Sequence, residues 1–257
     1  MMNKNAPVGF SQLIKRAWLD FTVQQKLEGH SAIKARSILD HFLAEQISVG
    51  SNARRNSRQR TISILSKIWL NVPKSIDSFR EEGLMHFQKN PENIRIAAHW
   101  GMAMATYPFF AIGAENMGRL LKLQNEVSTI QLQKRMGEKL GERETVTRAT
   151  RQLIRCWAEW GILTEGDHKG IYQVVESPLI IDSQFTTWLL ESALLARQEQ
   201  SANVHNLVNY TPALFPFQLS ADYFTPNERL ETFSQGVNEK GVTFSYSYQK
   251  PTANSQT

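Results

Sequence analysis

Residues 128–175 constrain the fold of this chain more than any other stretch, because helix and turn signals follow one another there in order. Ser128 and Gln131 stand three residues apart, as the two partners of a helix capping box do. Gly141 can take the positive φ that commonly ends a helix, and Gly161 stands where a second helix would end. The pattern therefore predicts two helices separated by a tight turn.

Both predicted helices carry an apolar stripe near helical spacing. In the first helix the stripe comprises Ile130, Leu132, Met136 and Leu140. In the second it comprises Val146, Ala149, Leu153, Cys156, Trp157 and Trp160. Two β-prone runs follow at 162–164 and 171–175, and the loop between them is typical of a slightly long hairpin tip. Helix, turn, helix and hairpin in this order predict a winged helix-turn-helix, whose usual partner is duplex DNA.

The second helix carries its polar residues on the side away from its tryptophans, namely Thr147, Arg148, Arg151 and Arg155. Arginine there can pair with phosphates or bind guanine edges, and threonine can bond to phosphate or contact a thymine methyl group. His168 and Lys169 fall at the hairpin tip, where a wing commonly meets the DNA backbone or minor groove. Two other interpretations stay open, because such arginines can be an ordinary solvated face and winged helices also dock proteins.

Residues 10–122 are predicted to be almost entirely helical, with a first helix from Ser11 to Gly29 that carries Ile14 on its apolar side. A second basic cluster lies within 51–70, where no acidic residue occurs. It comprises Arg54, Arg55, Arg58, Arg60 and Lys67. Cations near the start of a helix oppose its dipole, so the pattern slightly favours phosphate binding over a solvated charge run.

We expect a mainly α fold in three consecutive parts. These are a helical domain with a basic helix at 1–122, a winged helix-turn-helix at 123–182, and a C-terminal part at 183–257. The C-terminal part should hold a helix, an irregular segment, a small β-hairpin and a disordered polar tail. The stretch 96–114 contains no Asp, Glu, Lys or Arg, but Pro108 interrupts it. It therefore predicts buried helices joined at Pro108 rather than a membrane span.

Composition narrows the class of protein. The 257 residues include 29 Lys and Arg against 24 Asp and Glu, an excess that favours polyanionic partners. The single cysteine, Cys156, excludes an internal disulfide framework, and no signal peptide is recognisable, so a cytoplasmic protein is expected. The six histidines show no metal-binding spacing, and no glycine-rich phosphate loop occurs. We expect no enzyme, no cofactor and no metal, with Cys156 in the core.

The layout resembles the BrxA family, small DNA-binding components of BREX bacteriophage-defence systems, or a close relative of it. The residues that carry the resemblance are the arginine-rich stretch SNARRNSRQRTISILSKIWL, an alanine-rich helix that reaches a Tyr-Pro pair, and the stretch RETVTRATRQLIRCWAEWGIL with its hairpin. The resemblance covers roughly residues 10–175. It implies a helical first domain, a winged helix-turn-helix, binding of double-stranded DNA without catalysis, and work beside the other proteins of the defence system.

The sequence thus leads to the hypothesis of a non-catalytic DNA-binding accessory protein of a bacterial antiphage system, which binds mainly through phosphate contacts. The alternatives are a protein-docking adaptor, with an exposed apolar patch near 210–217, and a transcriptional regulator. A nuclease or toxin would require clustered carboxylates or histidines that the sequence does not show. The oligomeric state stays open.

Overall fold

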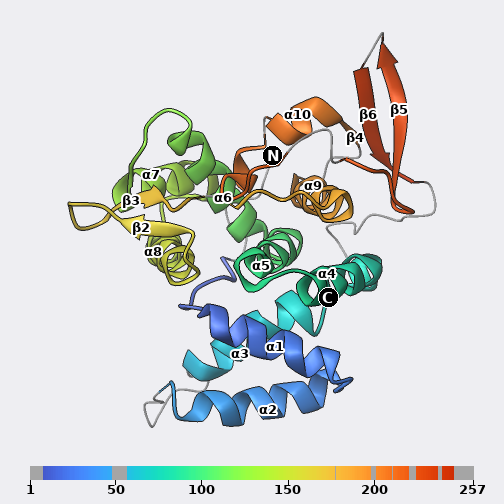
Figure 1. Cartoon of the computed structure of the whole chain (residues 1–257). Coiled ribbons are helices and arrows are strands. Elements are labelled where there is room, and N and C mark those ends of the chain that lie inside the picture. Colours follow the sequence, from blue (N-terminus) through green and yellow to red (C-terminus); the bar gives the residue numbers. More distant parts are fainter. Residues whose placement is uncertain are drawn as a thin grey trace. The chain divides into compact units, whose positions relative to one another are not determined.

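The computed structural model describes residues 8–47, 57–176, 178–197, 201–209, 211–219, 224–236 and 239–245. The fold is mainly helical, as expected, with two small three-stranded antiparallel sheets (Figure 1). The chain forms two compact units, of which unit 1 comprises Met1–Val72 and Leu123–Val175 and unit 2 comprises Pro73–Lys122 and Glu176–Thr257. This division differs from the three consecutive parts expected, because the chain leaves unit 1 after Val72 and returns to it at Leu123.

Unit 1 begins with three helices that pack against one another, α1 (Arg16–Leu27), α2 (Ala32–Ala44) and α3 (Ser57–Trp69). Ser31 caps α2 by accepting a hydrogen bond from the backbone N–H of Lys34 at 3.3 Å. The rings of Phe21 and Phe42 stack with centroids 4.0 Å apart and tie α1 to α2. The three helices therefore bury a common core, to which α3 contributes Trp69.

The second part of unit 1 contains β1 (Val127–Ser128), α7 (Thr129–Leu140), α8 (Glu144–Glu159), β2 (Leu163–Glu165) and β3 (Ile171–Val174). The strands form an antiparallel sheet in the order β1-β3-β2. The expected helix, turn, helix and hairpin are thus present in the expected order, and β1 adds a third strand that the sequence pattern did not indicate.

Unit 2 is built from helices and the second sheet. Its elements are the 3₁₀ turns Lys74–Ile76 and η2 (Pro212–Leu214), the helices α4 (Asp77–Lys89), α5 (Glu92–Thr106), α6 (Pro108–Leu121), α9 (Ser183–Arg197) and α10 (Val204–Asn209), and the strands β4 (Ser201–Asn203), β5 (Leu230–Gly236) and β6 (Glu239–Phe244). The strand order is β4-β6-β5. The expected C-terminal hairpin is β5–β6, and the expected disordered tail at 251–257 lies outside the described residues.

The ring of Trp188 on α9 occupies the core of unit 2. Its indole N–H donates to the carbonyl oxygen of Phe79 at 2.8 Å, and the Phe79 ring stacks on it with centroids 4.5 Å apart. Gly83 of α4 and Gly101 of α5 both face this ring, and a Cβ at Gly83 would lie 2.6 Å from Trp188 Cζ2. Two glycines on different helices therefore make room for one tryptophan.

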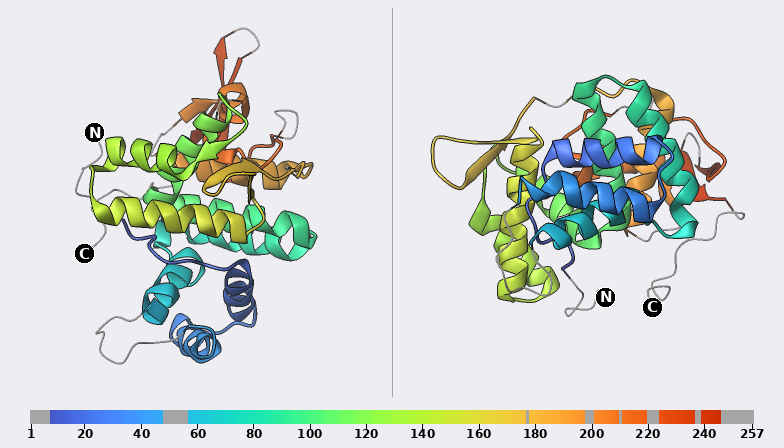
Figure 2. Two further views of the ribbon diagram at one scale, coloured as in Figure 1. Left: turned by 90° about the vertical axis from the view of Figure 1, so that its left-hand side faces the viewer. Right: turned by 90° about the horizontal axis from the view of Figure 1, so that it is seen from below.

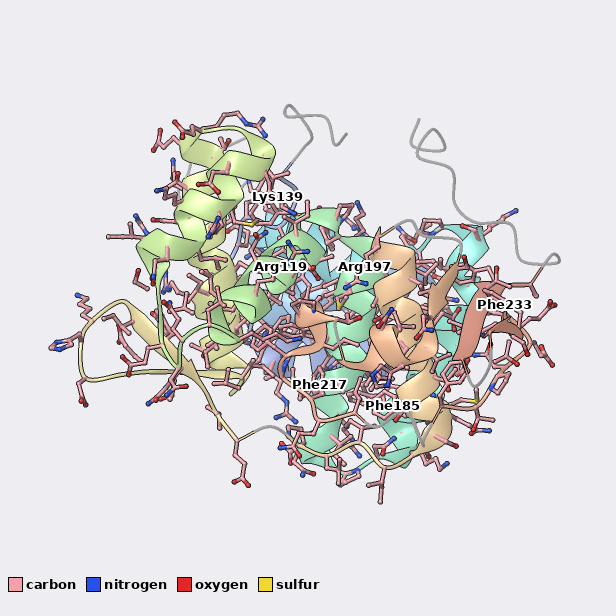
Figure 3. The ribbon with its side chains drawn as sticks, turned by 90° about the horizontal axis from the view of Figure 1, so that it is seen from above. Arg119, Lys139, Phe185, Arg197, Phe217 and Phe233 are labelled. Carbon is pink, nitrogen blue, oxygen red and sulfur yellow. The ribbon has the colours of Figure 1, made fainter. Side chains whose placement is uncertain are left out.

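Charged side chains connect α6 and α9 of unit 2. Glu115 of α6 accepts from Arg119 at 2.7 Å and from Arg197 of α9 at 3.4 Å, and the two arginines are labelled in Figure 3. The pair Glu115–Arg119 lies within one helix turn, whereas Arg197 comes from a helix 82 residues away. The shared carboxylate thus contributes a tertiary link between α6 and α9.

The uncharged stretch 96–114 is divided between α5 and α6, which meet at Pro108 as the sequence predicts. Pro108 stands at the first position of α6, where a missing N–H has no cost. Throughout the ranges that the structure describes, no helix has the length and apolar character needed to cross a lipid bilayer.

Candidate nucleic-acid interface

The helices α7 and α8 and the turn between them owe their shape to local interactions that the sequence indicates. The Ser128 hydroxyl accepts from the N–H of Gln131 at 3.2 Å, and the Gln131 side chain accepts from the N–H of Ser128 at 2.8 Å. This reciprocal pair is the predicted capping box. Gly141 ends α7 with φ +90°, and α8 begins three residues later at Glu144. Figure 2 shows α7 and α8 side by side, and the Gln133 amide donates to the carbonyl oxygen of Thr147 at 3.0 Å.

The predicted apolar stripe of α8 is confirmed, because all of its residues are buried. The stripe of α7 is confirmed in part: Leu132, Met136 and Leu140 are buried, but Ile130 is 76% exposed. Two residues turn a helix by about 200°, so Ile130 lies on the opposite side from Leu132. Its inclusion in the buried stripe was wrong.

A segment that the sequence pattern assigned to a helix instead covers α8. The expected helix from Ser11 to Gly29 is wrong at its start, since α1 begins at Arg16. Ile14 is fully buried, its N–H donates to Cys156 Sγ at 3.1 Å, and its carbonyl oxygen accepts from the indole N–H of Trp160 at 2.9 Å. These tertiary bonds use the backbone groups that a helix would need. In the sequence, only the apolar character of Phe10 and Ile14 could have indicated that this segment packs into the core. Both residues are 0% exposed in the structure.

The opposite face of α8 is open to solvent. Arg148, Arg151 and Arg155 are exposed, and Thr147 is half-buried, so the four predicted residues lie away from the buried stripe. Arg148 Nη1 lies 3.6 Å from Glu144 Oε1 at 74% side-chain exposure, which makes this ion pair weak. Among the described residues, Arg151 has no hydrogen-bond or ion-pair partner for its side chain. The face therefore keeps cationic groups available for an anionic partner.

The same face carries three polar residues that the sequence analysis did not single out: Glu144, Gln152 and Glu159. Glu144 and Glu159 are exposed, and Gln152 Oε1 lies 3.5 Å from Arg155 Nη1. Their spacing of three, four or seven residues from the arginines was the signal that could have revealed them.

The hairpin tip is preorganised by backbone contacts. Gly170 has φ +82°, its N–H donates to Glu165 Oε1 at 2.6 Å, and its carbonyl oxygen accepts from the N–H of Thr129 at 2.8 Å. The end of the connecting loop is thereby attached to the first residue of α7. His168 and Lys169 are exposed on the connecting loop, as predicted, and this loop projects away from α7 and α8 (Figures 1 and 2).

The second basic cluster is only partly available. Arg54 and Arg55 lie outside the described residues. Arg58 Nε donates to Asp40 Oδ1 at 2.8 Å, and Gln59 donates to the same oxygen atom at 2.8 Å. The Arg58 side chain therefore ties α3 to α2, a structural role that the sequence pattern missed because Asp40 precedes it by 18 residues.

Two further residues complete this cluster. The side chain of Lys67 is half-buried, and burial lowers the pKa of its ammonium group. Arg60 is exposed on α3. Within the described part of the cluster, Arg60 is thus the arginine best placed to meet a phosphate.

Charge is distributed unevenly between the two units. Unit 1 contains 19 Lys and Arg against 11 Asp and Glu, a net charge of +8, whereas unit 2 contains 10 against 13, a net charge of −3. The modest positive excess of the whole chain therefore conceals a strongly basic unit that contains both arginine clusters.

Other kinds of site find less support in the described residues. No group of three or more His, Cys, Asp or Glu side chains there could hold a metal ion. Cys156 is fully buried, as expected of a core residue, and burial raises the pKa of its thiol to about 12. Most of the apolar segment expected to form a docking patch is buried instead, since Ala213, Leu214 and Phe217 are at most 6% exposed and the Trp100 indole donates to the Ala213 carbonyl at 2.9 Å. Tyr210, the first residue of that expected patch, lies outside the described residues.

Comparison with known proteins finds no matching family model, no similar curated protein and no matching solved structure.

Proposed function

We propose that unit 1 binds duplex DNA through a winged helix-turn-helix in which α8 is the recognition helix and the β2–β3 hairpin is the wing. The observation that carries the proposal is the exposed arginine face of α8, formed by Arg148, Arg151 and Arg155 opposite the buried stripe. The net charge of +8 on unit 1 supports a polyanionic partner. The exposed tip residues His168 and Lys169 would contact the backbone or minor groove.

The resemblance to the BrxA family supports a more specific form of the proposal. In that form the chain is a non-catalytic accessory protein of a BREX-like antiphage system, and it binds DNA beside other proteins of that system. Arg60 of the helical part would add a backbone contact to those made by α8.

A titration of fluorescently labelled duplex DNA over a range of salt concentrations tests the proposal. Replacing both Arg148 and Arg151 with alanine should weaken binding to every duplex and reduce the slope of log K against log salt by about 1 for each of these arginines that contacts a phosphate. Lys74→Ala is the matched control, because Lys74 is an exposed cation in unit 2. An unchanged affinity and slope in the double variant, with its fold verified by circular dichroism, would show that α8 is not the DNA-binding helix.

Docking of a protein is a second candidate, favoured by two of the exposed apolar side chains in unit 1. Leu123 is 82% exposed and Ile130 is 76% exposed, near the start of α7. A partner protein that covered both side chains would remove their apolar surface from water. Ile130→Ser separates the two roles, since it should abolish assembly with a partner protein while leaving the affinity for duplex DNA unchanged.

A further inference from the structure

The exposed face of α8 carries acidic, neutral and basic side chains in a regular order. Four side chains follow one another along this face at spacings of four, four and three residues: Glu144, Arg148, Gln152 and Arg155. Such spacings place side chains one above the other on a helix. The contacts Glu144–Arg148 at 3.6 Å and Gln152–Arg155 at 3.5 Å confirm that neighbours along the row reach one another.

Glu144 would not help a helix that only binds phosphates to bind them. Its carboxylate is 82% exposed, next to Arg148 at 74% exposure, and would be repelled by a phosphate bound at that arginine. Glu144 also lies in the first turn of α8, where a carboxylate favours the helix itself. This stabilisation of the helix does not depend on bound DNA. A measurement of base preference therefore distinguishes a Glu144 that contacts bases from one that only stabilises the helix.

The four side chains share a forked polar end group that can form two hydrogen bonds in one plane. In the major groove, arginine donates in this way to O6 and N7 of guanine, glutamine pairs with adenine, and glutamate accepts from N4 of cytosine. The row is therefore suited to base edges, and Thr147 and Arg151, which lie beside it on the same face, are assigned to contacts with the DNA backbone.

We propose that α8 reads base edges of a duplex containing G·C pairs, with Arg148 donating to guanine and Glu144 accepting from the amino group of cytosine. Gln152 and Arg155 extend the same row, and Arg151 holds the backbone. The inference rests on the proposed binding of duplex DNA by unit 1. Beyond the proposed function, it assigns to α8 a preference for DNA sequence in addition to the attraction for phosphates.

Selection from a pool of random duplexes with the full chain tests the inference. The wild type should enrich a short motif with G·C pairs and bind it about 5- to 100-fold more tightly than a duplex with one such pair replaced. Glu144→Ala and Glu144→Gln should lose the preference for cytosine at one position and keep the rest of the motif. Arg148→Lys keeps the positive charge but removes the forked guanidinium group. This variant should lose the preference for guanine while retaining its affinity for duplex DNA of any sequence.

Arg151→Ala is the matched control, because loss of a backbone contact should weaken binding to all duplexes equally and leave the motif intact. Binding of every duplex with equal affinity would overturn base readout while the proposed DNA binding stands. Failure to bind any duplex at low salt would overturn the proposed function itself. If Glu144→Ala raised affinity for all duplexes by one factor without changing the motif, Glu144 would be only a repulsive surface group, and its assignment would be wrong.

Discussion

The indole N–H of Trp160 donates to the carbonyl oxygen of Ile14 at 2.9 Å, across 146 residues of chain. Trp160 follows the last residue of α8, and Ile14 belongs to the non-helical segment before α1. Both residues are buried, so water cannot replace this bond without opening the core. The bond connects the back of the proposed recognition helix to the helical part of unit 1.

Trp160→Phe keeps most of the ring but leaves the carbonyl oxygen of Ile14 buried without this donor. We expect the free energy of unfolding to fall by about 1–3 kcal/mol, measured by urea denaturation. Trp18→Phe is the matched control, because the Trp18 indole donates at 2.7 Å to the side chain of Gln46, which is exposed and can bond to water instead. Equal losses of unfolding free energy in the two variants would contradict the stabilising role of the bond between Trp160 and Ile14.

Cys156 should be inert towards thiol reagents in the folded protein. Its thiol is fully buried, and its pKa of about 12 leaves almost no thiolate at pH 8. Labelling at pH 8 should therefore follow unfolding, with one thiol per chain reacting in denaturant and Trp160→Phe accelerating the native reaction. Rapid stoichiometric labelling of the native wild type would show that the segment around Ile14 does not cover α8 in solution.

Gly83→Ala should destabilise unit 2 even though alanine normally favours a helix. The new Cβ would lie 2.6 Å from the Trp188 ring, and overpacking costs about 1–3 kcal/mol. Gly137→Ala in α7 is the control, because its Cβ would meet Glu142 Cγ at an ordinary 3.5 Å. There alanine should raise the free energy of unfolding by about 0.5–1 kcal/mol. Stabilisation by both substitutions would contradict the packing of Trp188 against α4.

Arg229 neutralises a carboxylate that has no access to solvent. Its Nε and Nη2 donate to the two oxygens of Glu191 at 2.7 and 2.8 Å, and it also pairs with Glu82 of α4. Glu191 is 0% exposed, so Arg229→Met should cost about 3–5 kcal/mol of unfolding free energy. The double variant Arg229→Met, Glu191→Leu should recover much of this loss, since it removes the stranded charge. A small effect of the single variant would refute the structural importance of this pair.

Asp182 should make unit 2 sensitive to acid. Burial alone would raise the pKa of its carboxyl group, but hydrogen bonds at 2.9 Å from Lys89 and from the N–H of Phe185 outweigh it and lower the pKa. Because the folded-state pKa is the lower one, the stabilisation is present above the unfolded value near 3.8 and is lost as pH falls through the folded value.

Asp182→Asn isolates this charge, because asparagine caps a helix about as well as aspartate. The variant should be less stable than the wild type at pH 7, and the difference should shrink below about pH 4 in thermal denaturation curves. A difference that stayed constant from pH 7 to pH 3 would contradict the lowered pKa.

The sequence alone predicted those features that depend on residues close together in the chain. The capping box of Ser128 and Gln131, the turn at Gly141 and the buried stripe of α8 each involve neighbours within one or two helical turns. The exposed arginines of α8 followed from the same periodicity. Local spacing was sufficient there because it decides by itself which side of a helix each residue occupies.

Only the tertiary structure decided which segments pack together. The bond between Trp160 and Ile14 keeps residues before Arg16 out of a helix, and the pair Arg58–Asp40 turns an arginine of the expected phosphate-binding cluster into a link between α2 and α3. Both contacts join residues far apart in the chain, so their free energy depends on a geometry that no local pattern encodes. Local sequence patterns thus predict the helices and strands within 128–175, whereas the structure of the other segments of unit 1 depends on their tertiary contacts.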